Sequence, residues 1–268
     1  PALLPCGDAE LLLHVCAVGL NFRDVLNVLG EYPGDPGPPG GDAAGTVEVA
    51  LPLLPAAFGL AHAPLACVAR AVLPMLAHMP ATLSFEQACT LPVTWSTTHA
   101  AVERATLRAD CSIIVQAAVG GVGLKAVEYA RWLNTLPIGM AGRPHKHAQL
   151  RATGVDASCS SRDGAAFSAG MTRLSDTARS HVVLNSLSLD LIAASFAALG
   201  EGSAFEEIGK RSIWASDRHR AAASTTSYCL VALDADMVCD PAWMHGMLTL
   251  LSVRAGVQVV ASLPLQAF

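Results

Sequence analysis

The spacing of apolar residues divides the chain into two parts. From Cys111 onward, short apolar runs alternate with stretches whose apolar positions repeat at helical spacing. Strands are expected over 112–118, 137–141, 157–161, 181–187, 203–209 and 228–235, with helices over 122–133, 144–153 and 189–199. Because repeated strand–helix units build parallel sheets, this pattern predicts an α/β domain with a doubly wound parallel sheet.

The first hundred residues do not alternate in this way. The expected elements are a strand over 9–20, a helix over 22–29 that Gly30 ends, a loop over 31–45 and a strand over 46–54. The helix is predicted because Phe22, Val25, Leu26 and Leu29 repeat at helical spacing. The pattern therefore predicts a separate, β-rich N-terminal domain.

Two further segments of this N-terminal part need interpretation. Residues 49–69 carry no charged side chain over about the length of a membrane span. They contain three prolines, however, and a proline inside a helix costs about 3 kcal/mol, so a loop-broken buried segment is expected instead. Farther on, Ser84 followed by Gln87 has the spacing of a capping box, which predicts a helix, a break at Pro92 and a second helix.

Composition narrows the class of protein. The 268 residues are 52% hydrophobic and 15% charged, which is typical of a well-packed globular protein. A net charge of -5 without a basic block argues against nucleic-acid binding. The eight cysteines contain no C-x-x-C pair and no signal-peptide pattern is seen, so reduced thiols in a cytoplasmic protein are expected.

A glycine cluster between a predicted strand and a predicted helix is the strongest candidate for a binding site. It resembles the dinucleotide motif G-x-G-x-x-G, except that Ala118 replaces the first glycine. Glycine there lets the backbone approach a pyrophosphate, and the helix N-terminus offers free N–H groups to the anion. A tight turn needed only for packing is the alternative. The expected cofactor contacts are Val119, Gly120, Gly121, Val122 and Gly123.

The residues after this motif favour one cofactor. NAD sites use an acidic residue about 20 positions farther on to bind the ribose hydroxyl. Here no acid occurs between Glu128 and Asp156, and basic residues stand at that distance. We therefore expect NADPH, with Arg143 and Lys146 binding its 2′-phosphate, unless this is only a solvated basic turn. No metal site is expected, because no cysteine or carboxylate lies beside the neighbouring histidines.

Several stretches together resemble a known family. "AVGLNFRDVLNVLGEYPGDPGPPGGDAAG", "AAVGGVGLKAVEYAR" and "VVLNSLSLDLIAASFAALGEGSAFEEIGK" are similar to the enoyl reductase domain of type I polyketide synthases. This domain belongs to the zinc-free, quinone-oxidoreductase-like part of the medium-chain dehydrogenase/reductase superfamily. The resemblance implies a GroES-like β-rich substrate domain over 1–97, a Rossmann NADPH-binding domain over 98–236, and a return to the substrate domain over 237–268.

The resemblance also implies a reaction. An enoyl reductase uses NADPH to reduce the trans-2-enoyl thioester of a polyketide or fatty acyl chain on an acyl carrier protein. Its partners would be the carrier protein and neighbouring synthase domains, with a homodimer left open. Residues 51–80 lack the family's usual Gly-rich turn and "GDRV"-like segment, the C-terminal part is shortened, and Pro137 interrupts a predicted strand. An inactive scaffold domain and a free NADPH quinone oxidoreductase therefore stay open as alternatives.

The family match assigns roles to individual residues. The expected catalytic residues are Tyr32 and Lys210 as proton donors and Asp234 as the partner of Lys210. Asn21, Thr97 and Gly209 are the expected contacts with the nicotinamide half of the cofactor, and Asn185 and Ser186 are expected to bind the cofactor at the end of a Rossmann strand. The alternatives are ordinary ones: an amphipathic loop tyrosine, a surface lysine after a strand, and a helix-capping asparagine.

Overall fold

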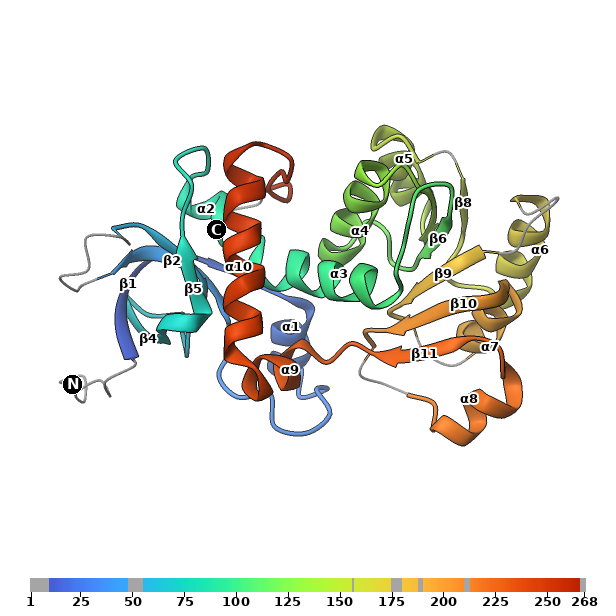
Figure 1. The fold of residues 1–268 in the computed structure, drawn as a ribbon, viewed down its shortest axis with the longest axis horizontal. Coiled ribbons are helices and arrows are strands. Elements are labelled where there is room, and N and C mark those ends of the chain that lie inside the picture. Colours follow the sequence, from blue (N-terminus) through green and yellow to red (C-terminus); the bar gives the residue numbers. More distant parts are fainter. Residues whose placement is uncertain are drawn as a thin grey trace. The chain divides into compact units, whose positions relative to one another are not determined.

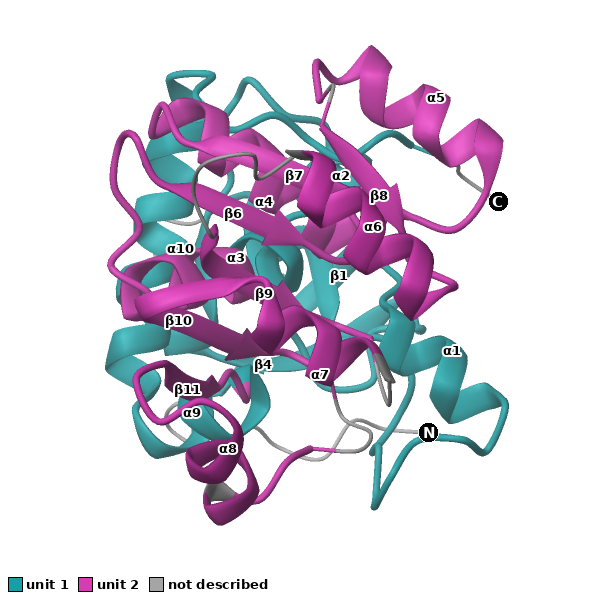
Figure 2. Cartoon of the chain, turned by 90° about the vertical axis from the view of Figure 1, so that its right-hand side faces the viewer, with its two compact units in different colours: residues 1–96, 233–268 teal, residues 97–232 magenta. Residues whose placement is uncertain are grey.

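The computed structural model describes residues 10–47, 55–155, 157–174, 180–187, 190–209 and 213–265 (Figure 1). The chain divides into two compact units (Figure 2). Unit 1 contains residues 1–96 and 233–268, and unit 2 contains residues 97–232. The divisions thus fall at 96/97 and 232/233, where the sequence suggested 97/98 and 236/237.

Unit 1 is built on a curled antiparallel sheet of five strands in the order β4-β1-β2-β3-β5. The strands are β1 (Glu10–Gly19), β2 (Asp42–Val47), β3 (Ala57–Leu60), β4 (Val68–Val72) and β5 (Leu76–His78). Side chains alternate between the two faces of a strand, and Leu11 and Leu13 of β1 both lie in the buried cluster of this sheet. The sheet is the predicted GroES-like, β-rich part of the fold.

Short helices complete unit 1. They are α1 (Phe22–Val28), the 3-10 helix η1 (Leu73–Met75), α2 (Phe85–Ala88), α9 (Leu233–Cys239) and α10 (Pro241–Gly256), while α3 (Pro92–Arg104) crosses the division between the units. The predicted capping box begins α2, since Gln87 N–H donates to Ser84 Oγ and Ser84 N–H to Gln87 Oε1. Helix α10 packs against β5 and η1, and Ser252 Oγ donates to His78 O at 2.6 Å.

One expectation for unit 1 needs correction and a second is tested only in part. The predicted loop over 31–45 ends early, because β2 begins at Asp42. The strand predicted over 46–54 is seen only at Thr46 and Val47, and 48–54 lie outside the described residues. Of the apolar repeat in α1 only Leu26 is buried, while Phe22 is 73% exposed. This helix is fixed by polar side chains instead, as the contacts of Asp24 below show.

Unit 2 contains a parallel sheet of six strands in the order β11-β10-β9-β6-β7-β8. The strands are β6 (Ser112–Val115), β7 (Leu136–Ala141), β8 (Ser158–Ser160), β9 (Ser180–Asn185), β10 (Leu199–Glu207) and β11 (Ser227–Leu230). Strand order reverses between β6 and β9, which defines a topological switch point. The predicted doubly wound Rossmann sheet is confirmed.

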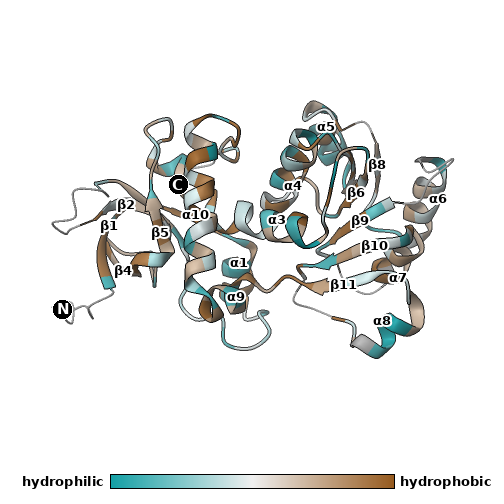
Figure 3. Ribbon diagram, viewed as in Figure 1, coloured by the Kyte–Doolittle hydropathy of each residue, from teal (hydrophilic) through white to brown (hydrophobic). Residues whose placement is uncertain are grey.

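The helices of unit 2 follow the strands as predicted. They are α4 (Gly121–Trp132), α5 (Pro144–Ala152), α6 (Gly164–Leu174), α7 (Asp190–Ala197) and α8 (Ser216–Ala222). Phe167 of α6 and Phe196 of α7 join Phe205 of β10 in one buried cluster. The apolar α7 and the polar, outward-facing α8 contrast in Figure 3.

Two expectations for unit 2 were wrong. Pro137 does not interrupt β7, which runs unbroken and pairs Pro137 with Ile113 of β6. The reason is local: pairing of β7 with β8 starts only at Gly139, so no ladder bond requires an N–H at Pro137. The strand predicted over 228–235 ends at Leu230, and Asp234 lies instead in the first turn of α9, where the helix dipole favours an acid.

The described cysteines are all free thiols. Within the described ranges, no helix is long and apolar enough to cross a membrane. Among the same residues, no group of three or more His, Cys, Asp or Glu side chains is arranged to hold a metal ion.

Candidate functional site

The glycine turn joins β6 to α4 at the carboxyl edge of the parallel sheet. Gly120 is the N-cap of α4, and this N-cap residue makes no side-chain hydrogen bond to the helix. A Cβ at Gly123 would lie 2.4 Å from Ala117 O and 2.6 Å from Ala118 Cα, so only glycine lets α4 pack this closely on the turn. The first turn of α4 is therefore an uncapped helix N-terminus beside the switch point, the usual geometry for binding a phosphate.

Ala118, which replaces the first glycine of the motif, follows a residue with an unusual backbone conformation. Ala118 N–H donates to Met140 O at 3.0 Å, which ties the turn to β7. The left-handed residue is its neighbour Ala117, with φ of 47°. The left-handed position of the turn thus lies one residue before the place where the motif carries its first glycine.

Basic side chains follow the next two strands at the same edge. Arg143 is the N-cap of α5, directly after β7, and both Arg143 and Lys146 are exposed. Arg162 follows β8, and its Nε would lie only 2.6 Å from a Cβ built on Gly142. Arg162 therefore lies over the loop that carries Arg143. The sequence interpretation missed it, although its place directly after a predicted strand was the available signal.

Buried polar side chains occupy the carboxyl ends of β6 and β9. Gln116 Oε1 accepts from the N–H groups of Ser186 and Leu187 at 3.2 and 3.1 Å, and Gln116 Nε2 donates to Ser195 Oγ at 2.7 Å. Gln116 thus fixes the turn after β9 from the neighbouring strand. Asn185, the last residue of β9, and Ser186, the first residue of this turn, are both expected to contact the cofactor.

Glu207 ends β10 beside the same turn. Its Oε2 accepts from Asn185 Nδ2 at 2.7 Å, and its Oε1 accepts from Gly209 N–H at 2.6 Å. Burial raises the pKa of this carboxyl to about 7, and the two hydrogen bonds oppose that rise. Glu207 brings together Asn185 and Gly209, two of the residues predicted from sequence. The sequence interpretation gave no role to Glu207 or Gln116.

Thr97 is buried in α3, beside a contact with the glycine turn. Thr98 Oγ1 donates to Val122 O at 3.3 Å, and His99 Nδ1 lies 2.9 Å from the hydroxyl of Tyr129 in α4. Helix α3 therefore packs along α4, and Thr97 lies one residue from the contact with its first turn.

In unit 1, Tyr32 and Asp234 lie together although 202 positions separate them in sequence. The Tyr32 hydroxyl donates to Asp234 Oδ2 at 3.5 Å. This places two of the three predicted catalytic residues side by side. The pairing predicted for Asp234 was with Lys210, which lies outside the described residues.

The loop that carries Tyr32 is fastened to α1 by three polar side chains. Arg23 Nη2 donates to Pro36 O, and Asn27 Nδ2 donates to Gly37 O at 2.9 Å. Buried Asp24 accepts from Gly40 N–H at 2.8 Å. These contacts hold a Pro- and Gly-rich loop that has no regular secondary structure of its own.

Asn21 contacts a buried acid of unit 1. Its Nδ2 donates to Asp42 Oδ2 at 3.0 Å, and Val93 N–H donates to Asp42 Oδ1 at 3.1 Å. Burial raises the pKa of Asp42 to about 7, against these two hydrogen bonds. Asn21 N–H also donates to Asp24 Oδ2 at 2.7 Å, which is the capping contact considered as the alternative role of Asn21.

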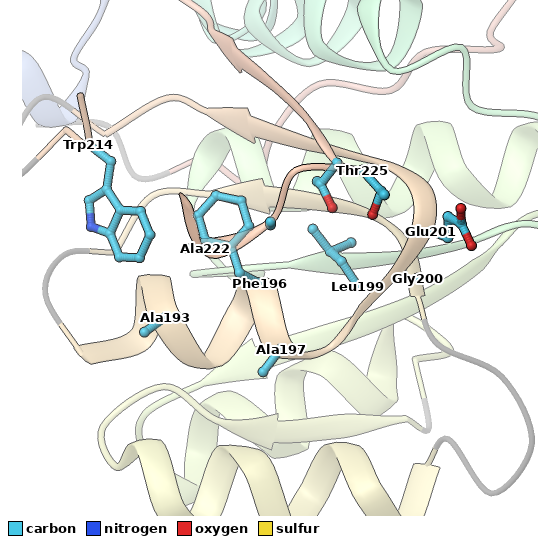
Figure 4. Close-up of a pocket in the computed structure, with 11 residues that line it drawn as sticks. Ala193, Phe196, Ala197, Leu199, Gly200, Glu201, Trp214, Ala222 and Thr225 are labelled. Atoms are coloured by element: carbon cyan, nitrogen blue, oxygen red, sulfur yellow. The ribbon is translucent and has the colours of Figure 1, made fainter. Parts of the chain in front are cut away.

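Unit 2 also contains a pocket of about 620 Å³ (Figure 4). Its walls include Phe196 of α7, Trp214, and Leu199 and Glu201 at the start of β10. Because β10 runs from Leu199 to Glu207, this pocket lies at the amino end of the strand, away from the edge that carries the glycine turn. It is therefore distinct from the candidate nucleotide site.

Comparison with known proteins identifies the family to which a chain with these two units belongs. No protein-family model matches the sequence. The chain is 40% identical over 221 residues, 79% of its length, to spectinabilin polyketide synthase system protein NorB of Streptomyces orinoci, and covers 10% of that protein. The solved CurK enoyl reductase matches with a TM-score of 0.88 and 27% identity, over 97% of this chain and 83% of that one. The chain belongs to the enoyl reductase domains of type I polyketide synthases.

This assignment confirms the resemblance inferred from sequence and the medium-chain dehydrogenase/reductase fold. A more distant likeness agrees with it: the quinone oxidoreductase of Thermus thermophilus, solved also in complex with NADPH, has a TM-score of 0.76 and 26% identity. That match covers 94% of this chain and 82% of that one. The chain spans a small part of the curated synthases that it matches, 4 to 12% of their length for the first six.

Proposed function

We propose that this enoyl reductase domain uses NADPH to reduce the trans-2-enoyl thioester of a polyketide or fatty acyl chain carried by an acyl carrier protein. The main support is the carboxyl edge of the parallel sheet. There an uncapped helix N-terminus follows β6, and basic side chains follow β7 and β8. An anion with one phosphate group beyond the pyrophosphate fits this arrangement.

The residues present fit NADPH. The turn from Val119 to Gly123 would hold the pyrophosphate, and Arg143, Lys146 and Arg162 would hold the 2′-phosphate. Asn185, Ser186 and Gly209 would hold the nicotinamide half. Asn185 Oδ1 and Ser186 Oγ suit this role, because both are buried and find no hydrogen-bond partner among the described residues. When bound, the cofactor supplies the hydride for the β-carbon.

The chain's own residues must supply a proton to the α-carbon and stabilise charge on the thioester oxygen. Tyr32 is one candidate donor. Its hydroxyl lies 3.5 Å from the carboxylate acceptor Asp234 Oδ2, a long and exposed contact. Lys210, next to Gly209 in sequence, is the second candidate, and Asp234 is the acid proposed to hold its ammonium group in place.

Turnover of variants tests these assignments. Tyr32→Phe and Lys210→Ala, singly and together, should lower kcat with an enoyl thioester while the Kd for NADPH stays near that of the wild type. A double variant that keeps wild-type kcat would exclude both residues as the proton donor.

The quinone oxidoreductase likeness supports a second candidate, reduction of a quinone by NADPH. Rates with crotonyl thioester and with a quinone, measured on the same preparation, separate the two activities. An inactive scaffold role within a synthase predicts a third result, namely no NADPH binding in a fluorescence titration. The carrier protein and neighbouring synthase domains are the proposed partners, since the curated relatives are synthases far longer than this chain.

A further inference from the structure

Glu207 is a buried acid that has no role of its own in the proposed reaction. Its side chain is fully buried, and both carboxylate oxygens are occupied by donors from the turns after β9 and β10. A buried carboxylate is costly, and the usual compensation is a set of hydrogen bonds with a defined geometry. Glu207 therefore adds a side-chain link between the ends of β9 and β10, where the backbone pairing ends with the bond from Ile208 N–H to Asn185 O at 2.9 Å.

The contact with Asn185 determines which way that amide faces. One N–H of Asn185 Nδ2 donates to Glu207 Oε2, and Nδ2 also donates to Leu187 O at 2.8 Å. Both amide protons are thus used within the chain. The remaining group is the acceptor Asn185 Oδ1, which is buried and has no partner among the described residues. Without the carboxylate, Leu187 O would be the remaining acceptor for Asn185 Nδ2 among the described residues, and rotation of the amide by half a turn would exchange the acceptor Oδ1 for a donor.

The turn that presents this acceptor is also fixed from the other side. Gln116 Oε1 holds the N–H groups of Ser186 and Leu187, so neither is offered to a ligand. The turn after β9 therefore presents one buried carbonyl oxygen and the hydroxyl of Ser186. A ligand that satisfies Asn185 Oδ1 must bring an N–H or O–H donor, as the carboxamide and the ribose of a nicotinamide nucleotide do.

We propose that Glu207 is a positioning residue for the nicotinamide half of the cofactor. It fixes Asn185 with its carbonyl oxygen available as an acceptor, and it fixes the Gly209 turn beside it. This inference rests on the proposed function, since it takes NADPH as the ligand. Glu207 itself need not touch the cofactor, and it has no part in holding the adenosine half.

Glu206 provides a matched control. It precedes Glu207 on the same strand, is 1% exposed, and also has its pKa raised to about 7 by burial. Because successive residues of a strand point to opposite faces, its side chain lies on the other face of the sheet, under the electrostatic influence of Arg104. Any general effect on ligand affinity of replacing a buried glutamate in β10 should therefore appear in both Glu206→Gln and Glu207→Gln.

The experiment compares the affinity of the whole chain for two ligands, NADPH and adenosine 2′,5′-bisphosphate. Adenosine 2′,5′-bisphosphate carries the adenosine and 2′-phosphate of NADPH but no nicotinamide. Calorimetric titration gives the Kd of each ligand for the wild type, Glu206→Gln and Glu207→Gln. Glu207→Gln should raise the Kd for NADPH about tenfold, which corresponds to about 1.4 kcal/mol, and change the Kd for the bisphosphate less than about twofold. Glu206→Gln should leave the ratio of the two constants unchanged.

The outcomes separate the two proposals. Equal weakening of both ligands by Glu207→Gln, or no weakening of either, would overturn the positioning role. A wild-type chain that binds neither ligand would instead overturn the proposed cofactor. If Glu207→Gln does not fold, Asn185→Ala replaces it: removal of the acceptor should produce the same selective loss of NADPH affinity, and unchanged affinity would again contradict the inference.

Discussion

The close packing of α4 on the glycine turn can be tested with one methyl group. In Gly123→Ala, the new Cβ would lie 2.4, 2.6 and 2.8 Å from the backbone atoms Ala117 O, Ala118 Cα and Ala118 C. Backbone cannot rotate away as a side chain can, so the helix or the turn must shift. Overpacking of this kind costs about 1–3 kcal/mol, while the gain in helix propensity from alanine is at most about 1 kcal/mol. Taking the middle of the cost range, about 2 kcal/mol, and a propensity gain between zero and about 1 kcal/mol, the net loss of stability should be about 1–2 kcal/mol.

Thermal unfolding followed by circular dichroism measures this loss. A destabilisation of that size should lower Tm by about 2–8 °C in a chain of this length. The displaced turn should also weaken NADPH binding. Gly120→Ala is the matched variant, since its Cβ would lie 3.2 Å from Ala117 O, and it should cost less than about 1 kcal/mol. If Gly123→Ala melts with the wild type and binds NADPH equally well, the close-approach argument is wrong.

Two further predictions concern charge. Removing a cation from the proposed 2′-phosphate site, in Arg143→Ala or Arg162→Ala, should raise the Kd for NADPH about tenfold and leave that for NADH unchanged; equal effects on both cofactors would contradict a phosphate contact. In unit 1, burial raises the pKa of Asp42 from 3.8 to about 7, so folding favours its protonated form. Its contribution to stability is therefore complete below about pH 4 and is lost as the pH rises through about 7. Urea unfolding of Asp42→Asn should show a smaller fall in the free energy of unfolding over this range than the wild type, and identical slopes would exclude Asp42 as a source.

Much of the fold could be predicted from the sequence, because the local sequence signals agree with the observed elements. The capping box at Ser84, the strand–helix repeat and the glycine turn are each recognisable within a few residues. The pattern failed where tertiary contacts decide. Pro137 stays in its strand because one side of β7 is unpaired there. The helix α1 was predicted correctly, but Asp24 fixes it while Phe22 remains exposed.

The candidate site was only partly predictable for the same reason. Gln116 and Glu207 are single polar residues at strand ends, and nothing in their spacing distinguishes them from solvated side chains. Their roles depend on partners about 70 and 20 positions away that only the sheet brings near. The contact between Tyr32 and Asp234, from opposite ends of the chain, likewise leaves no local pattern.

The proposed reaction is tested most directly by incubating the chain with crotonyl thioester and NADPH deuterated at the transferred hydride. The account predicts consumption of the cofactor and a saturated butyryl product with deuterium at the β-carbon and a solvent proton at the α-carbon. Unchanged thioester in the presence of bound cofactor, or cofactor consumed only when a quinone is supplied, would contradict it.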